Sequence, residues 1–193
     1  MEDTWKEVGV VLAAILIGFG REVKAYFKKR KTVDMFSDGL DYDVLINTEL
    51  DKLKYTYGFN RVAIVEFHNG LESYDGDSFN FMSMSHERTN NADSIIREFQ
   101  RIPVTPVAEW LSGFDKNPLG YAYVKEGDGG IGLMYDAFGA VETYVFKLGD
   151  RISNGVLMCA YVHQVGVLDD EAIMDCKASA YKIRLGLEKK KKL

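Results

Sequence analysis

Arg61-Val-Ala-Ile-Val-Glu-Phe-His-Asn-Gly70 is an apolar run that ends in a turn signal, and this pattern predicts the first strand of a folded domain. Successive side chains of a strand point to opposite faces, so the run has one purely apolar face and one that turns from apolar to polar. The first consists of Ala63, Val65 and Phe67, and the second of Val62, Ile64, Glu66 and His68. Because Glu and His are seldom fully buried without partners, the second face is typical of the floor of a ligand pocket.

The composition is that of a folded chain with an uneven distribution of charge. A hydrophobic content of 47% with 12% aromatic residues excludes a disordered protein. Residues 34–187 hold 24 acidic and 13 basic side chains, whereas residues 1–33 hold 7 basic and 4 acidic ones, and residues 188–193 hold 4 basic ones and 1 acidic one. The acidic body argues against nucleic acid, whose phosphates would repel it. The basic ends favour an anionic membrane surface.

The charge distribution divides the chain into a membrane anchor with a basic juxtamembrane segment (1–33), a domain (34–187) and a basic tail (188–193). Val8 to Phe19 is uncharged, and a helix extended from Trp5 to Tyr26 would be about 33 Å long, enough for the bilayer core of about 30 Å. The basic residues between 21 and 31 then place the domain in the cytoplasm. We therefore expect contact with the membrane through residues 5–31, as a single pass through the inner, cytoplasmic membrane.

Two alternatives to a membrane span stay open for this segment. A cleaved signal peptide is disfavoured, because Met1-Glu2-Asp3 lacks the usual positive charge. A helix that lies on the membrane surface or self-associates is favoured by the shortness of the apolar run.

Within residues 34–187 the periodicity predicts two long helices and several strands. The first helix, residues 41–57, carries apolar side chains three or four residues apart, and the last begins at Asp169 and carries a similar seam. These stripes are Ile46, Leu50, Leu53 and Tyr57, and Ile173, Cys176, Ala180, Ile183 and Leu187. Strands are predicted at 79–88, 120–124, 140–148 and 155–164, a helix from Asn91 or Asp93 to Gln100, and a helical turn at 107–111. The two stripes beside the anchor favour a homodimer.

The two cysteines, Cys159 and Cys176, are too few for a disulfide framework in a chain of this length. Their apolar surroundings in the sequence predict two buried thiols in a reducing compartment.

The order of these elements resembles a GAF domain, a PAS-related sensor fold. The resemblance covers residues 40–187 and rests on Arg61-Val-Ala-Ile-Val-Glu-Phe-His68, which follows a helix, and Asn154-Gly-Val-Leu-Met-Cys-Ala-Tyr161, which precedes the last helix. It implies an α+β fold in which a central antiparallel sheet carries the terminal helices on one face and a small-molecule pocket on the other. Phe67-His68-Asn69-Gly70 is also similar to short GAF-like proteins carried by bacteriophages.

The resemblance leaves the cofactor unknown. The Asn-Lys-Phe-Asp-Glu signature of cyclic-nucleotide-binding members is missing, and neither cysteine stands where bilin attachment would place it.

The candidate ligand-binding residues are the histidines and the carboxylates beside them on the predicted strands. They are Glu66, His68, His86, Glu87 and His163. An imidazole beside a carboxylate can bind a ligand, hold a metal or transfer protons, but no metal-binding or catalytic motif accompanies these five. The sequence therefore favours a non-enzymatic, membrane-anchored sensor of an unidentified small molecule. A structural or protein-interaction role for the same fold, and a hydrolase, remain alternatives.

Overall fold

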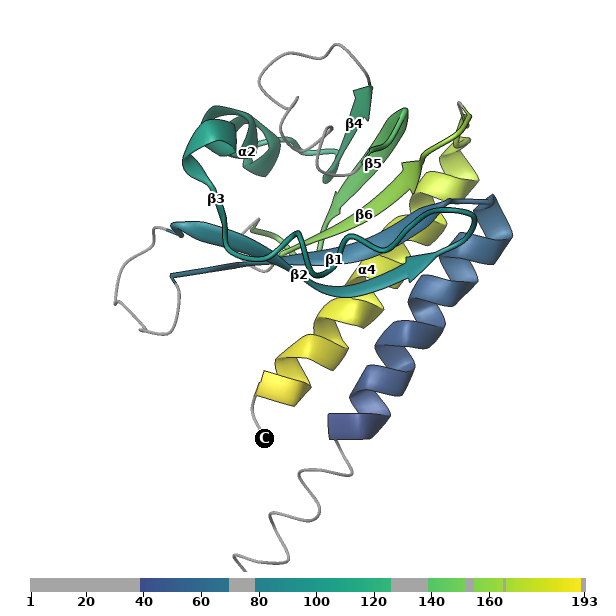
Figure 1. Ribbon diagram of the computed structural model, residues 1–193, viewed down its shortest axis with the longest axis horizontal. Helices are drawn as coiled ribbons and strands as arrows, with labels where there is room; N and C mark the ends of the chain where they lie inside the picture. Colours follow the sequence, from purple (N-terminus) through teal and green to yellow (C-terminus); the bar gives the residue numbers. More distant parts are fainter. Residues whose placement is uncertain (1–38, 70–78, 126–138, 152–154, 165, 192–193) are drawn as a thin grey trace, which may run out of the picture.

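The computed structural model describes residues 39–69, 79–125, 139–151, 155–164 and 166–191 (Figure 1). The predicted membrane span, the basic juxtamembrane segment and residues 192–193 lie outside this part of the chain. Among the helices that are described, none has both the length and the apolarity needed to cross a bilayer.

A six-stranded antiparallel sheet forms the centre of the domain, with strand order β3-β2-β1-β6-β5-β4. The strands are β1 (Arg61–His68), β2 (Phe81–Thr89), β3 (Ile102–Pro103), β4 (Tyr121–Lys125), β5 (Glu142–Lys147) and β6 (Val156–Tyr161). The organising run of the sequence is thus the third strand of the sheet, flanked by β2 and β6. Its alternation is observed, because Val62 and Ile64 pack in one core layer and Ala63 and Val65 in the other.

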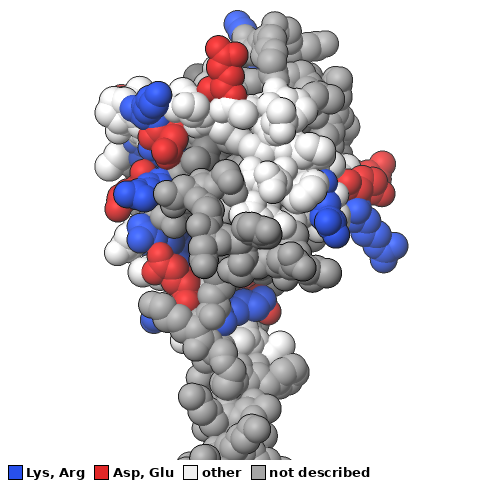
Figure 2. Space-filling view, turned by 90° about the vertical axis from the view of Figure 1, so that its left-hand side faces the viewer, with Lys and Arg blue, Asp and Glu red and all other residues white. Residues whose placement is uncertain are grey.

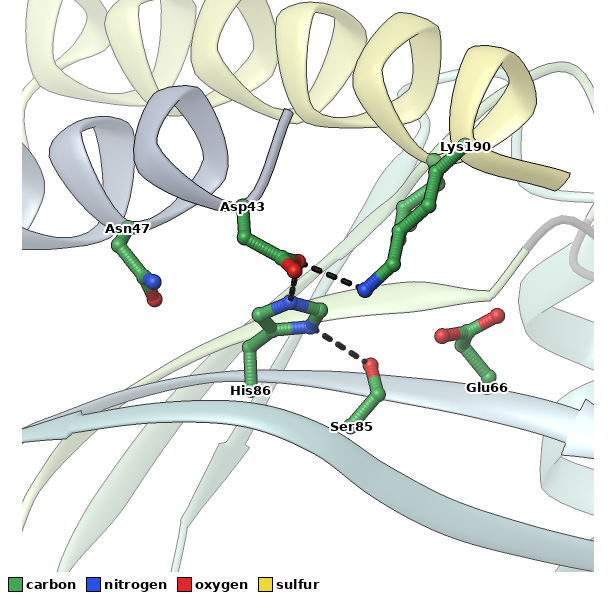
Figure 3. Close-up of a pocket in the computed structure, with 7 residues that line it drawn as sticks. Asp43, Asn47, Glu66, Ser85, His86 and Lys190 are labelled. Carbon is green, nitrogen blue, oxygen red and sulfur yellow. Dashed lines mark hydrogen bonds and ion pairs between the residues drawn. The ribbon is translucent and has the colours of Figure 1, made fainter. Parts of the chain in front are cut away.

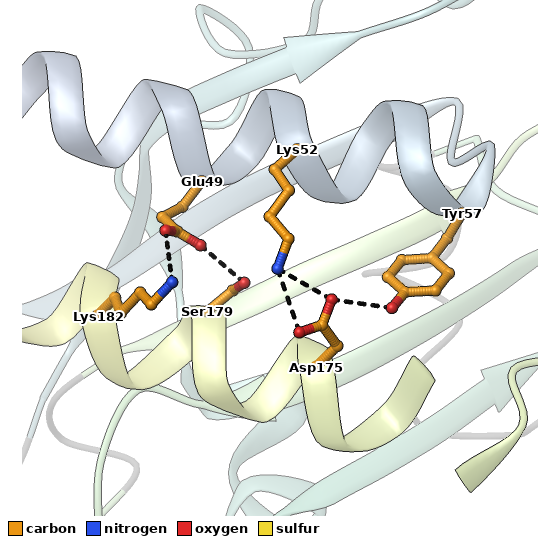
Figure 4. Close-up of polar contacts among 6 residues, drawn as sticks. All are labelled: Glu49, Lys52, Tyr57, Asp175, Ser179 and Lys182. Atoms are coloured by element: carbon orange, nitrogen blue, oxygen red, sulfur yellow. Dashed lines mark hydrogen bonds and ion pairs between the residues drawn. The ribbon is translucent and has the colours of Figure 1, made fainter. Parts of the chain in front are cut away.

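Two long helices cover one face of the sheet, as Figure 1 shows. They are the first helix, residues 39–57, and α4 (Asp170–Lys191). Their apolar stripes pack with Val62 and Ile64 of β1 and with Phe59 and Phe146 in a single buried layer. Polar contacts also join the two helices, since Lys52 donates to Asp175 at 2.9 Å (Figure 4).

The opposite face is covered by the middle of the chain. There η1 (Thr105–Val107) and α2 (Ala108–Asp115) contribute Val107, Leu111 and Phe114 to the second buried layer, and Phe99 joins them. The α+β fold predicted from the sequence is therefore observed, with the terminal helices on one face of an antiparallel sheet.

The predicted homodimer rests on the two apolar helix stripes being available to a second copy of the chain, and this premise is wrong. Ile46, Leu50 and Leu53 are fully buried in the protein's own core, as is Ile183, and Ala180 is 1% exposed. A helix that packs on a sheet needs the same spacing of three and four residues as a coiled-coil seam, so the spacing alone does not identify the partner.

The predicted helix between Asn91 and Gln100 is also wrong, because residues 96–98 form only a turn. The backbone N–H of Met84 in β2 donates instead to the carbonyl of Phe99 at 2.9 Å. Asn91 and Arg101 adopt positive φ angles of 55° and 56°, which are incompatible with an α-helix. Pairing with the sheet therefore replaces helix formation in this segment.

Candidate functional site

An open pocket of about 620 Å³ lies between the terminal helices and the β1–β2 pair (Figure 3). It is lined by Asp43, Asn47, Glu66, Ser85, His86, Leu187 and Lys190. These residues come from the first helix, β1, β2 and the last turns of α4. The pocket therefore lies on the face of the sheet that carries the terminal helices, whereas the resemblance to GAF domains implied a pocket on the opposite face.

Asp43 is the centre of the polar contacts in the pocket. Its Oδ1 accepts a hydrogen bond from Lys190 Nζ at 2.7 Å and lies 3.1 Å from His86 Nε2. The other ring nitrogen of His86, Nδ1, lies 3.1 Å from Ser85 Oγ. Figure 3 shows Asn47 and Glu66 on either side of this group. The first helix, β2 and α4 are thus joined through one carboxylate.

The Lys190 ammonium holds the pKa of Asp43 below its ordinary value of 3.8, burial opposes this effect, and the contact with His86 adds to it. Asp43 is therefore ionised at neutral pH. It accepts hydrogen bonds there but donates none.

A β-bulge positions the strand residues of the pocket. Ile64 pairs with His86, whereas the next residue, Val65, pairs with Met84, so Ser85 is an extra residue in β2. Because a bulge places two residues of one strand opposite one residue of its partner, both Ser85 and His86 reach the pocket.

The structure brings together two of the five candidate residues, Glu66 and His86, which both line the pocket. His68 lies further along β1, where its Nε2 is 2.8 Å from Ser83 Oγ and its ring stacks near Phe81.

The other two candidates lie elsewhere. Glu87 belongs to the opposite face of the sheet, where its carboxylate accepts a hydrogen bond from Arg61 Nε at 2.9 Å. Its side chain is 3% exposed, and it also accepts from the Ser94 hydroxyl. His163 is exposed and its Nε2 contacts the carbonyl of Asn91. The five residues therefore do not form one site.

Four further pocket residues were not predicted from the sequence: Asp43, Asn47, Ser85 and Lys190. Lys190 belongs to the predicted basic tail, but α4 continues to Lys191, so this lysine has a fixed helical position. Asp43 and Lys190 are 147 residues apart in the chain, and no local pattern connects them. The one signal available was the polar face of the first helix, which carries Asp43 and Asn47 one turn apart.

The contacts among Asp43, His86 and Ser85 join a carboxylate, an imidazole and a hydroxyl, which are the groups of a nucleophilic triad. Two features oppose that chemistry. The ammonium of Lys190 forms an ion pair with Asp43, the carboxylate that would have to stabilise a protonated His86. Ser85 is adjacent to His86 in the chain, so the contact between their side chains is a local one. Among the described residues, no group of three or more His, Cys, Asp or Glu side chains is placed to hold a metal ion.

Comparisons with known proteins identify the fold. No protein-family model matches the sequence, and no curated protein matches it. Among solved structures, the blue-light absorbing form of the Thermosynechococcus elongatus PixJ GAF domain has a TM-score of 0.58 at 14% identity, over 79% of this chain and 88% of that one.

Two photoreceptors with larger chains are similar as well. A Stigmatella aurantiaca phytochrome photosensory core has a TM-score of 0.56 at 13% identity, over 83% of this chain and 37% of that one. The chromophore-binding domain of a bacteriophytochrome from R. palustris has a TM-score of 0.57 at 10% identity, over 82% of this chain and 63% of that one. The chain therefore has a GAF-like fold.

Proposed function

We propose that this protein is a non-enzymatic sensor domain, tethered to a membrane, that binds a small polar molecule in the pocket around Asp43. The GAF-like fold supports this proposal, since the solved domains that share it include photosensory and chromophore-binding ones. The observation that carries it is the convergence of the first helix, β2 and α4 on the Asp43 carboxylate.

The chemistry of the pocket indicates the class of ligand. Lys190 supplies hydrogen-bond donors, Asp43 supplies acceptors, and Ser85, His86 and Asn47 offer both. A small molecule with donor and acceptor groups fits such a lining, and Leu187 provides an apolar surface beside them. A ligand group that accepts from Lys190 competes with Asp43 and weakens the contact between the first helix and α4. Ligand binding is thereby coupled to the packing of the terminal helices.

The arrangement of the helix ends supports a tether to the membrane. The start of the first helix and the end of α4 lie at the same end of the molecule (Figure 1), and Lys189 and Lys190 contact Tyr42 and Asp43 there. The basic segment between 21 and 31 precedes the first helix in the sequence. The described helix ends next to both basic regions of the sequence therefore lie on the same side of the domain, and an anionic membrane surface would complement these regions.

The outer faces of the helices support a homodimer. Leu40 and Val44 of the first helix are 51% and 65% exposed, and Met174, Tyr181 and Leu185 of α4 are 65%, 57% and 39% exposed. Large apolar side chains gathered on a surface are typical of interfaces. Tethering two copies to one membrane raises their effective concentration, so modest contacts suffice.

The test of the ligand proposal is native mass spectrometry of the full-length protein purified from cells, with metabolite extraction of the same samples. We expect a retained small molecule in the parent protein and its loss in Lys190→Gln and His86→Ala. The matched control is Lys182→Gln, which removes a lysine of α4 that pairs with Glu49 instead (Figure 4). Retention in both pocket variants would refute the site, and loss in the control would show that helix packing alone is involved.

The exposed apolar side chains also favour a second candidate, an interaction platform that needs no ligand. That role predicts self-association without any retained molecule, and disruption by Val44→Asp and Tyr181→Asp. The Lys190→Gln substitution would leave it unchanged.

A further inference from the structure

A second pocket, of about 460 Å³, lies on the other side of α4 from the first helix. It is lined by Leu119, Gly120, Lys147, Leu148, Gly149, Asp150, Lys177, Tyr181 and Arg184. Lys177, Tyr181 and Arg184 follow one another by four and three residues, so they occupy one face of the helix. The other walls are the end of β5 with the turn that follows it, and the residues just before β4.

Positive charge is concentrated in this pocket although the body of the protein is acidic. Among the described residues that line it, three are basic and one, Asp150, is acidic, whereas residues 34–187 as a whole carry 24 acidic and 13 basic residues. Such a concentration of cations in a concave site favours an anion there.

Within the described part of the chain, neither lysine of this pocket contacts an anionic group. Lys147 Nζ donates to the carbonyl oxygens of Asp115 and Asn117, at 2.8 and 3.4 Å. Lys177 Nζ lies 5.2 Å from the centre of the Tyr121 ring. Among the ion pairs between described residues, neither lysine pairs with a carboxylate, whereas Arg184 pairs with Glu188 at 2.7 Å.

We propose that this pocket binds a small phosphorylated molecule. A phosphate group accepts hydrogen bonds from lysine as a point charge and from arginine through its planar fork. The half-exposed ring of Tyr181 and the exposed side chain of Leu119 offer apolar surface to the rest of the molecule. The site shares no lining residue with the pocket around Asp43, so it is independent of the ligand site proposed above. Tyr181 belongs both to this pocket and to the apolar surface proposed for the homodimer.

The test is a titration of the ¹⁵N-labelled full-length protein in lipid nanodiscs with phenyl phosphate and with inorganic phosphate, followed by NMR. We expect saturable shifts of the Gly149 and Lys177 amides, with phenyl phosphate binding more tightly because of the apolar wall. Lys177→Gln and Arg184→Gln should each weaken binding by about tenfold, as expected for the loss of one charge-assisted hydrogen bond. Lys177→Arg keeps the charge and should retain most of the affinity.

Two controls make the result decisive. Lys182→Gln removes an equal charge from the side of α4 that contacts Glu49, and it should leave the affinity unchanged. Benzoate tests whether the site recognises phosphate or any aromatic anion, and it should bind much more weakly. Shifts that do not saturate, or an equal loss of affinity in Lys182→Gln, would overturn the proposal, as would binding of benzoate as tight as that of phenyl phosphate.

Discussion

Arg61 and Glu87 form a buried ion pair across β1 and β2, with Nε and Oε1 2.9 Å apart and side chains that are 4% and 3% exposed. The guanidinium also donates to the carbonyl of Asp93 at 2.7 Å, and the Ile95 N–H donates to the Glu87 carboxylate at 3.3 Å. Burial lowers the pKa of Arg61, and the negative charge of Glu87 opposes this shift. The pair therefore fixes the segment after β2 against the sheet.

Removing one partner of this pair should destabilise the protein strongly. Glu87→Leu removes the carboxylate that neutralises the buried Arg61 guanidinium, and we expect a loss of about 3–5 kcal/mol in the free energy of unfolding. The double variant Arg61→Met/Glu87→Leu removes both charges and should recover much of that loss. Urea unfolding followed by circular dichroism measures both effects. A double variant as unstable as the single one would show that the hydrogen bonds to residues 93–95, and not the ion pair, hold the segment.

Cys159 and Cys176 are both fully buried and unpaired by a disulfide, as the sequence predicted. Burial raises the pKa of the Cys159 thiol well above its ordinary value, and a hydrogen bond with Cys176 adds to the effect. Because the thiolate is the reactive form, we expect Cys159 to resist thiol reagents at about pH 8 while the protein is folded. Its labelling rate should rise with urea in parallel with global unfolding. Fast labelling without denaturant would contradict the buried, protonated thiol.

The periodicity of the sequence predicted the secondary structure best where one face of an element is buried and the other is not. The first helix and α4 are of this kind, because their apolar residues repeat with the period of a helix. β1 is buried on both faces over its first five residues, and there a short apolar run that ends in a turn signal predicts the strand. The segment 91–100 was predicted wrongly, since its cap signals at Asn91 and Asp93 were outweighed by backbone pairing between Met84 and Phe99.

The candidate site was predictable only in part, for reasons of register and sequence distance. The alternation of β1 predicts that Glu66 lies on the face that turns from apolar to polar, and Glu66 does line the pocket. A bulge at Ser85 brings His86 to the same pocket. Such a bulge cannot be recognised from the residue pattern of a strand of this length. The contact between Asp43 and Lys190 depends on how two distant helices pack, which periodicity does not encode.

The contact between the terminal helices should depend on pH in the acid range. Hydrogen bonds from Lys52, and then from Tyr57, hold the pKa of Asp175 below its ordinary value of 3.8. Because the pKa of Asp175 is lower in the folded state than in the unfolded state, the ionised carboxylate stabilises the folded protein above about pH 4. This stabilisation is lost as the pH falls through the pKa that Asp175 has in the folded state.

We therefore expect Asp175→Asn to be less stable than the parent at about pH 7, by about 0.5 kcal/mol because this pair is partly exposed. The difference should vanish at about pH 2, where both proteins carry an uncharged side chain at this position. Urea unfolding at the two pH values measures it. A difference that persists undiminished in acid would show that the amide disturbs packing and that the charge of Asp175 is not responsible.

The final prediction concerns Gly155, which precedes β6 with a φ of 98°. A Cβ atom at this position would lie 2.8 Å from the carbonyl oxygen of Val65 and 3.1 Å from Leu148 Cδ1. Since β1 and β6 pair at this point, the backbone oxygen has little freedom to move. Gly155→Ala should therefore destabilise the protein by about 1–3 kcal/mol through backbone strain and this close contact.

The matched control for that substitution is Gly113, a helical glycine of α2 at which a Cβ atom would meet nothing within 4 Å. Gly113→Ala should stabilise the protein by about 0.5–1 kcal/mol, since alanine loses less backbone entropy than glycine in a helix. Thermal unfolding of the two variants beside the parent protein measures both changes. If Gly155→Ala were as stable as the parent, the backbone at the start of β6 would have to adopt another conformation, and the close packing of β6 on β1 described above would be incorrect.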